Sequence, residues 1–135
     1  MGEFPEWFPN GCPHDAAEVN TTLYHGCETD PASQEDFTPH ARSDLPRKQA
    51  MARAGGCMAF GLSVWTSEAD ATHAQELFRY AARWHIFRGD VTEDDGQLAP
   101  TPTANQPSHH TFWAYDGIDL MGKFVPALPP LAGGA

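Results

Sequence analysis

The chain has 135 residues, of which 41% are hydrophobic and 19% are charged, and its acidic residues outnumber its lysines and arginines by 18 to 8. The formal net charge of −10 repels phosphate backbones, so we expect no nucleic-acid-binding surface. No segment approaches the run of about 18 apolar residues that a membrane-spanning helix needs. The composition therefore predicts one soluble domain without membrane contact.

The N-terminal segment and the cysteines both favour a cytoplasmic location. The first residues, MGEFPEWFPNGCP, have neither the basic start nor the apolar block of a signal peptide. The three cysteines, Cys12, Cys27 and Cys57, form an odd set, which argues against a disulfide framework and for a reducing compartment.

The first third of the chain predicts an arm followed by short elements. Residues 1–20 are rich in proline and aromatic residues and are expected to form an extended arm. Residues 21–25 (TTLYH) favour a strand. Asp30-Pro31 resembles a helix N-terminus and predicts a short helix toward Phe37. A second helix is expected over residues 43–53, capped by Ser43-Asp44 and closed by Gly55-Gly56.

The middle of the chain predicts a buried strand and the longest helix. Residues 57–66 (CMAFGLSVWT) are nearly continuously apolar, which is typical of a central strand. A helix is expected from Thr66 or Ser67, with acidic residues in its first turn. Its buried stripe is predicted to consist of Ala74, Leu77, Phe78 and Ala81.

The last third predicts further strands. Residues 84–91 and 97–99 favour strands around an acidic turn, and residues 100–108 favour a loop. Residues 109–115 and 118–124 are expected to form a hairpin around Asp116-Gly117, and residues 126–135 a flexible tail. We therefore expect a single α+β domain over residues 21–125, with mainly antiparallel strands and two or three helices.

Two short Cys/His pairs allow a zinc-binding interpretation. Cys12 and His14 form one pair, and His25 and Cys27 form the other. Zinc accepts two thiolates and two imidazoles in a tetrahedron, although structural sites usually leave two to four residues between paired ligands. The alternative is that the cysteines are small buried residues and the histidines lie at the surface.

A possible ligand wall comes from residues 109–115 (HHTFWAY). If Phe112 and Ala114 face the core, then His109, Thr111, Trp113 and Tyr115 share the other face of the strand, because neighbouring side chains alternate. That face could stack on a flat ligand and hydrogen-bond it. The alternative is an ordinary half-buried strand.

Two segments resemble the ADP-ribosyltransferases of the diphtheria-toxin and poly-ADP-ribose type. LYHG at residues 23–26 is similar to their opening strand, and GLSVWT at residues 61–66, followed by an acidic helix start, is similar to their second element. The resemblance implies a split sheet and an NAD site. In that site His25 would bind the ribose, Gly26 would let nicotinamide meet the backbone, and Trp65 would stack on the nicotinamide. Neighbouring positions would support the site: Tyr24, Ser63, Thr66 and Trp113.

The third element of that family is a late glutamate, and no glutamate follows Glu93 here. His109 or His110 would have to take over its role. An imidazole replaces a carboxylate poorly beside a developing cation, so the sequence favours binding over catalysis. The chain also resembles a family of small, uncharacterised bacterial proteins, through an Asp-Phe pair, a GLSV strand and a late SHxTxW motif.

The sequence thus gives three functional hypotheses. The first is a domain that binds NAD or an ADP-ribose-type nucleotide. The second is a non-catalytic acidic or immunity-type module for a basic protein partner, based on the charge of −10. The third is a small zinc-binding domain.

Overall fold

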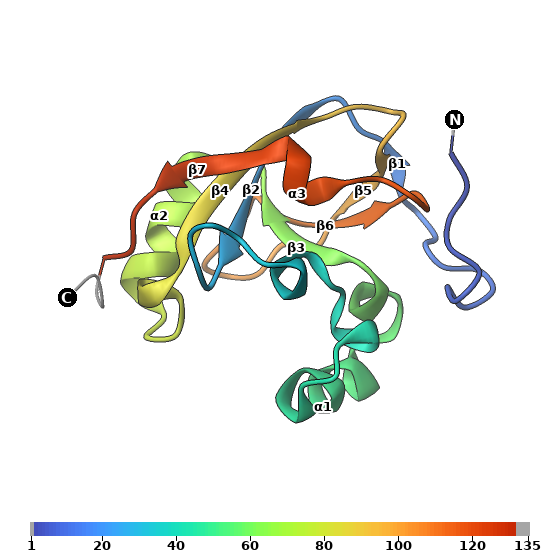
Figure 1. Cartoon of the computed structure of the whole chain (residues 1–135), viewed down its shortest axis with the longest axis horizontal. Coiled ribbons are helices and arrows are strands. Elements are labelled where there is room, and N and C mark those ends of the chain that lie inside the picture. Colours follow the sequence, from blue (N-terminus) through green and yellow to red (C-terminus); the bar gives the residue numbers. More distant parts are fainter. Residues whose placement is uncertain (1, 132–135) are drawn as a thin grey trace.

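The computed structural model describes residues 2–131 and contains one antiparallel seven-stranded sheet. The strand order is β1-β5-β6-β3-β2-β4-β7 (Figure 1). The α+β class predicted from the sequence is confirmed. The strands are β1 (Ala17–Glu18), β2 (Thr21–Cys27), β3 (Leu62–Trp65), β4 (His85–Val91), β5 (Gly96–Pro100), β6 (His109–Ala114) and β7 (Phe124–Leu128). The helices are α1 (Pro46–Gly55), α2 (Glu68–Leu77) and α3 (Leu120–Lys123).

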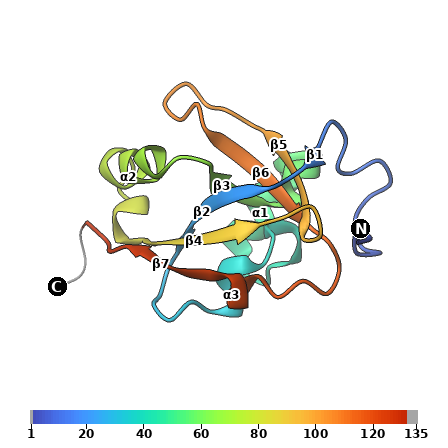
Figure 2. The same cartoon turned by 90° about the horizontal axis from the view of Figure 1, so that it is seen from above.

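The two faces of the sheet are covered by different elements. Directly paired residues of antiparallel strands share a face, so the pair Tyr24–Trp65 and the pair Trp65–His109 define one side, called here the Trp65 face. Helix α2 covers it with Ala71 and Ala74. The opposite side, called here the His25 face, is covered by a 3-10 turn, Gln34–Phe37, and by α3. Figure 2 shows α2 and α3 on opposite sides of the strands.

Most of the apolar core lies on the His25 face. Leu23, Val64 and Phe112 are almost fully buried there, Phe37 closes the core from the covering turn, and Phe124 joins it from β7. A second, smaller cluster on the Trp65 face surrounds the alanines of α2. Small side chains allow this helix to approach the sheet closely, which explains its alanine-rich sequence.

Helix α2 begins as predicted but buries a narrower stripe. The Ser67 hydroxyl accepts a hydrogen bond from the Asp70 backbone N–H at 3.1 Å, which is the expected N-cap. The helix ends at Leu77, because Phe78 adopts extended backbone angles. Leu77 is 45% exposed, so its predicted place in the buried stripe is wrong.

Helix α1 also differs from its prediction at one end. It begins at Pro46, whose missing N–H suits the first helical position, and not at Ser43-Asp44. Gly56 ends it with φ +58°, a conformation that favours glycine, as the sequence predicts. In the preceding segment the expected helix from Asp30-Pro31 is only the 3-10 turn at Gln34–Phe37.

The predicted hairpin over residues 109–124 does not form. Strand β6 pairs with β3 and β5, whereas β7 pairs with β4 at the other end of the sheet. Between them, the Asp119 side chain accepts a hydrogen bond from the Gly122 N–H and caps α3. Strand β7 continues to Leu128, so the first residues of the expected tail belong to the sheet. Residues 132–135 lie outside the described residues.

The structure contains a disulfide that the sequence argument does not anticipate. Cys12 in the N-terminal arm is bonded to Cys57, with the Cα atoms 5.5 Å apart. The expectation of unpaired cysteines is therefore wrong. Residues 56–60 form a 3-10 helix, and β3 begins only at Leu62, so the predicted strand over residues 57–66 is shorter than expected. Cys27 is a buried free thiol.

None of the helices in the described part of the chain is long and apolar enough to span a bilayer.

Candidate functional site

His25 lies inside the protein and binds backbone atoms of neighbouring elements. Its side chain is 8% exposed. Nδ1 lies 2.8 Å from the Ser63 carbonyl oxygen and Nε2 lies 2.5 Å from the Asp36 carbonyl oxygen. Phe37 packs on the ring with centroids 5.2 Å apart. The geometry is that of a side chain that fixes β2 to β3 and to the Gln34–Phe37 turn.

The space beside Gly26 is filled by another residue of this chain. A Cβ atom at this position would collide with the indole ring of Trp84. The resemblance implies that this glycine leaves room for nicotinamide. Here the glycine instead allows Trp84 to pack against the backbone of β2.

Trp65 lies on the opposite face of the sheet from His25. It is 4% exposed, and its indole N–H donates to the Gln106 side-chain oxygen at 2.7 Å. Half-buried Tyr24 is paired with it across the strands. His109 meets the ring edge-on, with centroids 6.4 Å apart. The structure therefore brings Trp65, Tyr24 and His109 together, but leaves His25 outside this group.

His109 belongs to a small polar network on the Trp65 face. Its Nδ1 lies 2.9 Å from the Thr101 carbonyl oxygen and 3.0 Å from the Thr101 hydroxyl, which in turn contacts the Thr111 hydroxyl. Burial lowers the pKa of His109 below its usual range, and nearby His110 adds to this effect, although the bond to Thr101 opposes it. His110 itself lies beside the Ser108 carbonyl oxygen.

The remaining predicted ligand-wall residues are largely covered. Thr111, Trp113 and Tyr115 are buried, and the Trp113 indole N–H donates to the Cys57 carbonyl oxygen at 2.8 Å. Ser63 is exposed on the same face. Thr66 is half-buried, and its backbone N–H donates to Ser108.

The four residues of the zinc hypothesis do not form a cluster. Cys12 is in the disulfide, and exposed His14 contacts the carboxylate of Asp15. Cys27 is buried, and burial together with the nearby carboxylates Asp36 and Asp30 raises the pKa of its thiol far above the ordinary range. Within residues 2–131 no three His, Cys, Asp or Glu side chains are placed to hold a metal ion. The zinc hypothesis is therefore not supported.

Three arginines and two aromatic residues line an open hollow of about 700 Å³. We call it the arginine hollow, and it is lined by Glu28, Arg47, Arg79, Tyr80, Arg83 and Trp84. Arg47 comes from the first turn of α1, and the RYAARW segment that follows α2 supplies four of the others. Three of the eight lysines and arginines of this acidic chain thus meet at one place.

The rings of the arginine hollow form a continuous aromatic surface. Tyr80 is 62% exposed and stacks on Phe78, with the ring centroids 5.3 Å apart and an interplanar angle of 17°. It also meets the edge of Trp84 at 5.4 Å. Because Trp84 is held against Gly26, one side of this surface is fixed by the sheet.

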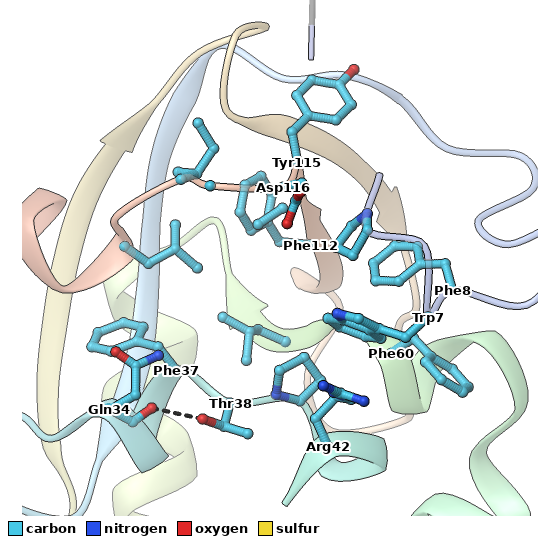
Figure 3. A pocket seen from close by; sticks show the side chains of 18 residues that line it. Trp7, Phe8, Gln34, Phe37, Thr38, Arg42, Phe60, Phe112, Tyr115 and Asp116 are labelled. Carbon is cyan, nitrogen blue, oxygen red and sulfur yellow. Dashed lines mark hydrogen bonds between the residues drawn. The ribbon is translucent and has the colours of Figure 1, made fainter. Parts of the chain in front are cut away.

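A second cavity of about 280 Å³ is lined by residues of the N-terminal arm and of the His25 face. We call it the arm pocket. Figure 3 shows Trp7, Phe8 and Phe60 on one side of it and Phe37 and Phe112 on the other. The charged residues in its lining are Arg42 and Asp116. The Arg42 guanidinium lies over the Trp7 ring, 4.8 Å from its centroid.

Both cavities consist mainly of residues that the sequence argument does not select. RYAARW is a local signal for the arginine hollow, because it carries two arginines beside two aromatic residues. The contribution of Arg47, more than thirty positions earlier, has no local signal. The arm pocket also has no local signal, because its lining joins the N-terminal arm to distant segments around Arg42, Phe60 and Phe112.

Comparison with protein-family models, with curated proteins and with solved structures finds no significant match to this chain.

Proposed function

We propose that this chain is a binding protein for a small nucleotide-type anion, such as ADP-ribose or NAD, and that the ligand occupies the arginine hollow. The observation that carries the proposal is the convergence of three arginines with two aromatic rings on a chain of net charge −10. The proposal keeps the ligand class suggested by the ADP-ribosyltransferase resemblance and assigns it a different site.

The charges in the hollow suit phosphate groups. Three guanidinium groups face one carboxylate, and the Arg47–Glu28 pair is loose at 4.0 Å and exposed. Such a pair contributes little and can rearrange around a ligand. Arg79 and Arg83 form no ion pair with any described residue. A planar guanidinium can donate two parallel hydrogen bonds to a phosphate, which a single carboxylate in the hollow does not prevent.

The rings suit the base or nicotinamide of the same ligand. Exposed Tyr80 offers a flat surface, and stacking of a base on an aromatic side chain contributes about 1–3 kcal/mol. A hollow of about 700 Å³ lies within the range of roughly 300–1,000 Å³ that is usual for small-molecule sites.

Catalysis is not part of the proposal. His25 is committed to two backbone carbonyl groups, and no residue of the arginine hollow is a histidine or a nucleophile. The hollow offers positive charge and stacking surface, which are binding functions.

Calorimetric titration with ADP-ribose at low salt would test the proposal, with adenosine and inorganic phosphate as partial ligands. We expect ADP-ribose to bind more tightly than either part. Arg79→Gln and Arg83→Gln should each weaken binding at least tenfold, because a charge-assisted hydrogen bond contributes about 1.5–3 kcal/mol. Tyr80→Ala should weaken ADP-ribose and adenosine alike.

Arg53→Gln is the matched control, since it removes an exposed charge from α1 without touching the hollow. Equal effects of Arg53→Gln and Arg79→Gln would mean that only the overall charge matters. The absence of any heat with millimolar ADP-ribose would refute the proposal. His25→Ala is unsuitable as a binding control, because it alters the interior of the fold.

The alternative of an acidic module for a basic protein partner rests on the net charge alone. It predicts an association rate that falls steeply as salt is added. A partner complex that is unaffected by Arg79→Gln and sensitive to salt would favour it over the nucleotide proposal.

The compartment is also open to test. The expected cytoplasmic location rests in part on the odd number of cysteines, whereas the Cys12–Cys57 disulfide fits an oxidising compartment. Mass spectrometry of the chain, isolated from its source after rapid alkylation of free thiols, would show which state exists.

A further inference from the structure

We propose that the arm pocket is a second binding site and that it takes a small organic ammonium ion. This site is separate from the arginine hollow: the two share no lining residue and lie in different parts of the molecule.

Aromatic rings supply most of the wall on the arm side. The Trp7 and Phe8 rings lie 4.7 Å apart with an interplanar angle of 66°, and each is 6.1 Å from the Phe60 ring. These three side chains are only half-buried, so they are accessible from the pocket. The face of an aromatic ring attracts a cation, and several rings set at angles to one another form the usual binding site of quaternary ammonium groups.

The carboxylate of Asp116 adds a negative charge to the same pocket. Figure 3 shows it pointing into the cavity. Its side chain has no hydrogen bond or ion pair with any residue in the described range 2–131. The backbone N–H of Asp116 donates to the Glu3 carbonyl oxygen at 2.8 Å, which fixes the residue beside the arm. A cation is also favoured by the net charge of −10.

The guanidinium of Arg42 already makes a cation–π contact with this aromatic wall. This guanidinium lies over Trp7 and is exposed to solvent. It competes with a ligand cation for the ring and repels it. Removing the Arg42 charge should therefore strengthen binding of a cation, whereas removing the Asp116 charge should weaken it. An anionic ligand would respond to both changes in the opposite direction.

The disulfide holds the two sides of the aromatic wall together. Cys12 lies four residues after Phe8, and its partner Cys57 lies three residues before Phe60. Without this bond the arm can move relative to the Gly56–Phe60 turn, and the three rings lose their mutual arrangement. Binding should therefore be weaker in the reduced protein.

The test uses choline and its neutral isostere 3,3-dimethylbutan-1-ol as probes, which differ in charge but little in shape. Choline should bind roughly tenfold or more tightly than the alcohol, which is the range of a desolvated cation–π contact. Titrations followed by NMR would locate the site, since choline should shift the indole N–H signal of Trp7 and not that of Trp84. Saturating ADP-ribose should not displace choline.

Four variants decide the assignment. Trp7→Leu should abolish choline binding, Asp116→Asn should weaken it several-fold, and Arg42→Gln should strengthen it. Glu93→Gln removes an exposed charge outside the pocket and should change nothing. Far-UV circular dichroism of each variant, and of Cys12→Ser, checks that the fold is intact. Equal affinity for the alcohol, reversed effects at Arg42 and Asp116, or shifts at Trp84 alone would each overturn the proposal.

Discussion

Replacing His25 by alanine should destabilise the fold strongly. The substitution removes both partners of the Ser63 and Asp36 carbonyl oxygens and leaves a cavity beside Phe37. Each buried carbonyl group left without a partner costs about 1–3 kcal/mol, and truncation of a buried ring adds about 2 kcal/mol or more. We expect the free energy of unfolding to fall by roughly 4–5 kcal/mol, a large part of the 5–15 kcal/mol typical of a domain.

His25→Phe separates the two contributions. Phenylalanine keeps a ring against Phe37 and Phe124 but cannot donate to either carbonyl group. We expect it to cost about half as much as the alanine variant, since only the hydrogen-bond contribution of about 2 kcal/mol is lost. His14→Ala provides the control, because His14 is exposed and should change stability by no more than about 0.5 kcal/mol.

Urea unfolding followed by tryptophan fluorescence measures these differences, provided that the variants unfold with the same dependence on urea concentration. A loss of less than about 1 kcal/mol in His25→Ala would refute the reasoning. It would mean that His25 is not a structural bridge and is free for a role in ligand binding.

Three further predictions concern other buried groups. Cys27 should resist iodoacetamide in the native protein and react only after unfolding, adding a single alkyl group without reductant, because burial raises the pKa of its thiol. Burial lowers the pKa of His109 in the folded chain, so the unfolded chain takes up a proton first as the pH falls. The free energy of unfolding should therefore be lower at about pH 5.5 than at pH 7.5. Urea titrations at both pH values should show a smaller difference for His109→Asn than for the unmodified chain. Gly26→Ala should displace Trp84, lower the melting temperature by overpacking, and alter ADP-ribose binding; an unchanged tryptophan spectrum would contradict this.

Local signals in the sequence predicted the elements that local contacts stabilise. Helix α2 follows from its Ser67 cap, and β2 and β4 follow from their β-favouring side chains. The hairpin prediction failed because the pairing of β7 with β4 depends on the arrangement of the whole sheet, which Asp116-Gly117 does not reveal. The turn residues there lead into α3 instead.

The burial of His25 is predictable from the alternation of side chains along β2. Its strand neighbours two positions away, Leu23 and Cys27, are both apolar, which indicates a buried face. The LYHG motif instead favours a ligand-binding role for the same histidine. The disulfide had no such signal, because the spatial proximity of Cys12 and Cys57 depends on how the arm folds back over the domain.

The two ends of the sheet limit how this protein can assemble with other chains. Strand β1 has only two residues, and β7 carries Pro126, which lacks the N–H that a neighbouring strand would use. Exposed edge strands otherwise serve as templates for pairing and aggregation. A sheet that ends in this way is a poor template for strand addition, which favours assembly of this protein through its faces over assembly through its edges.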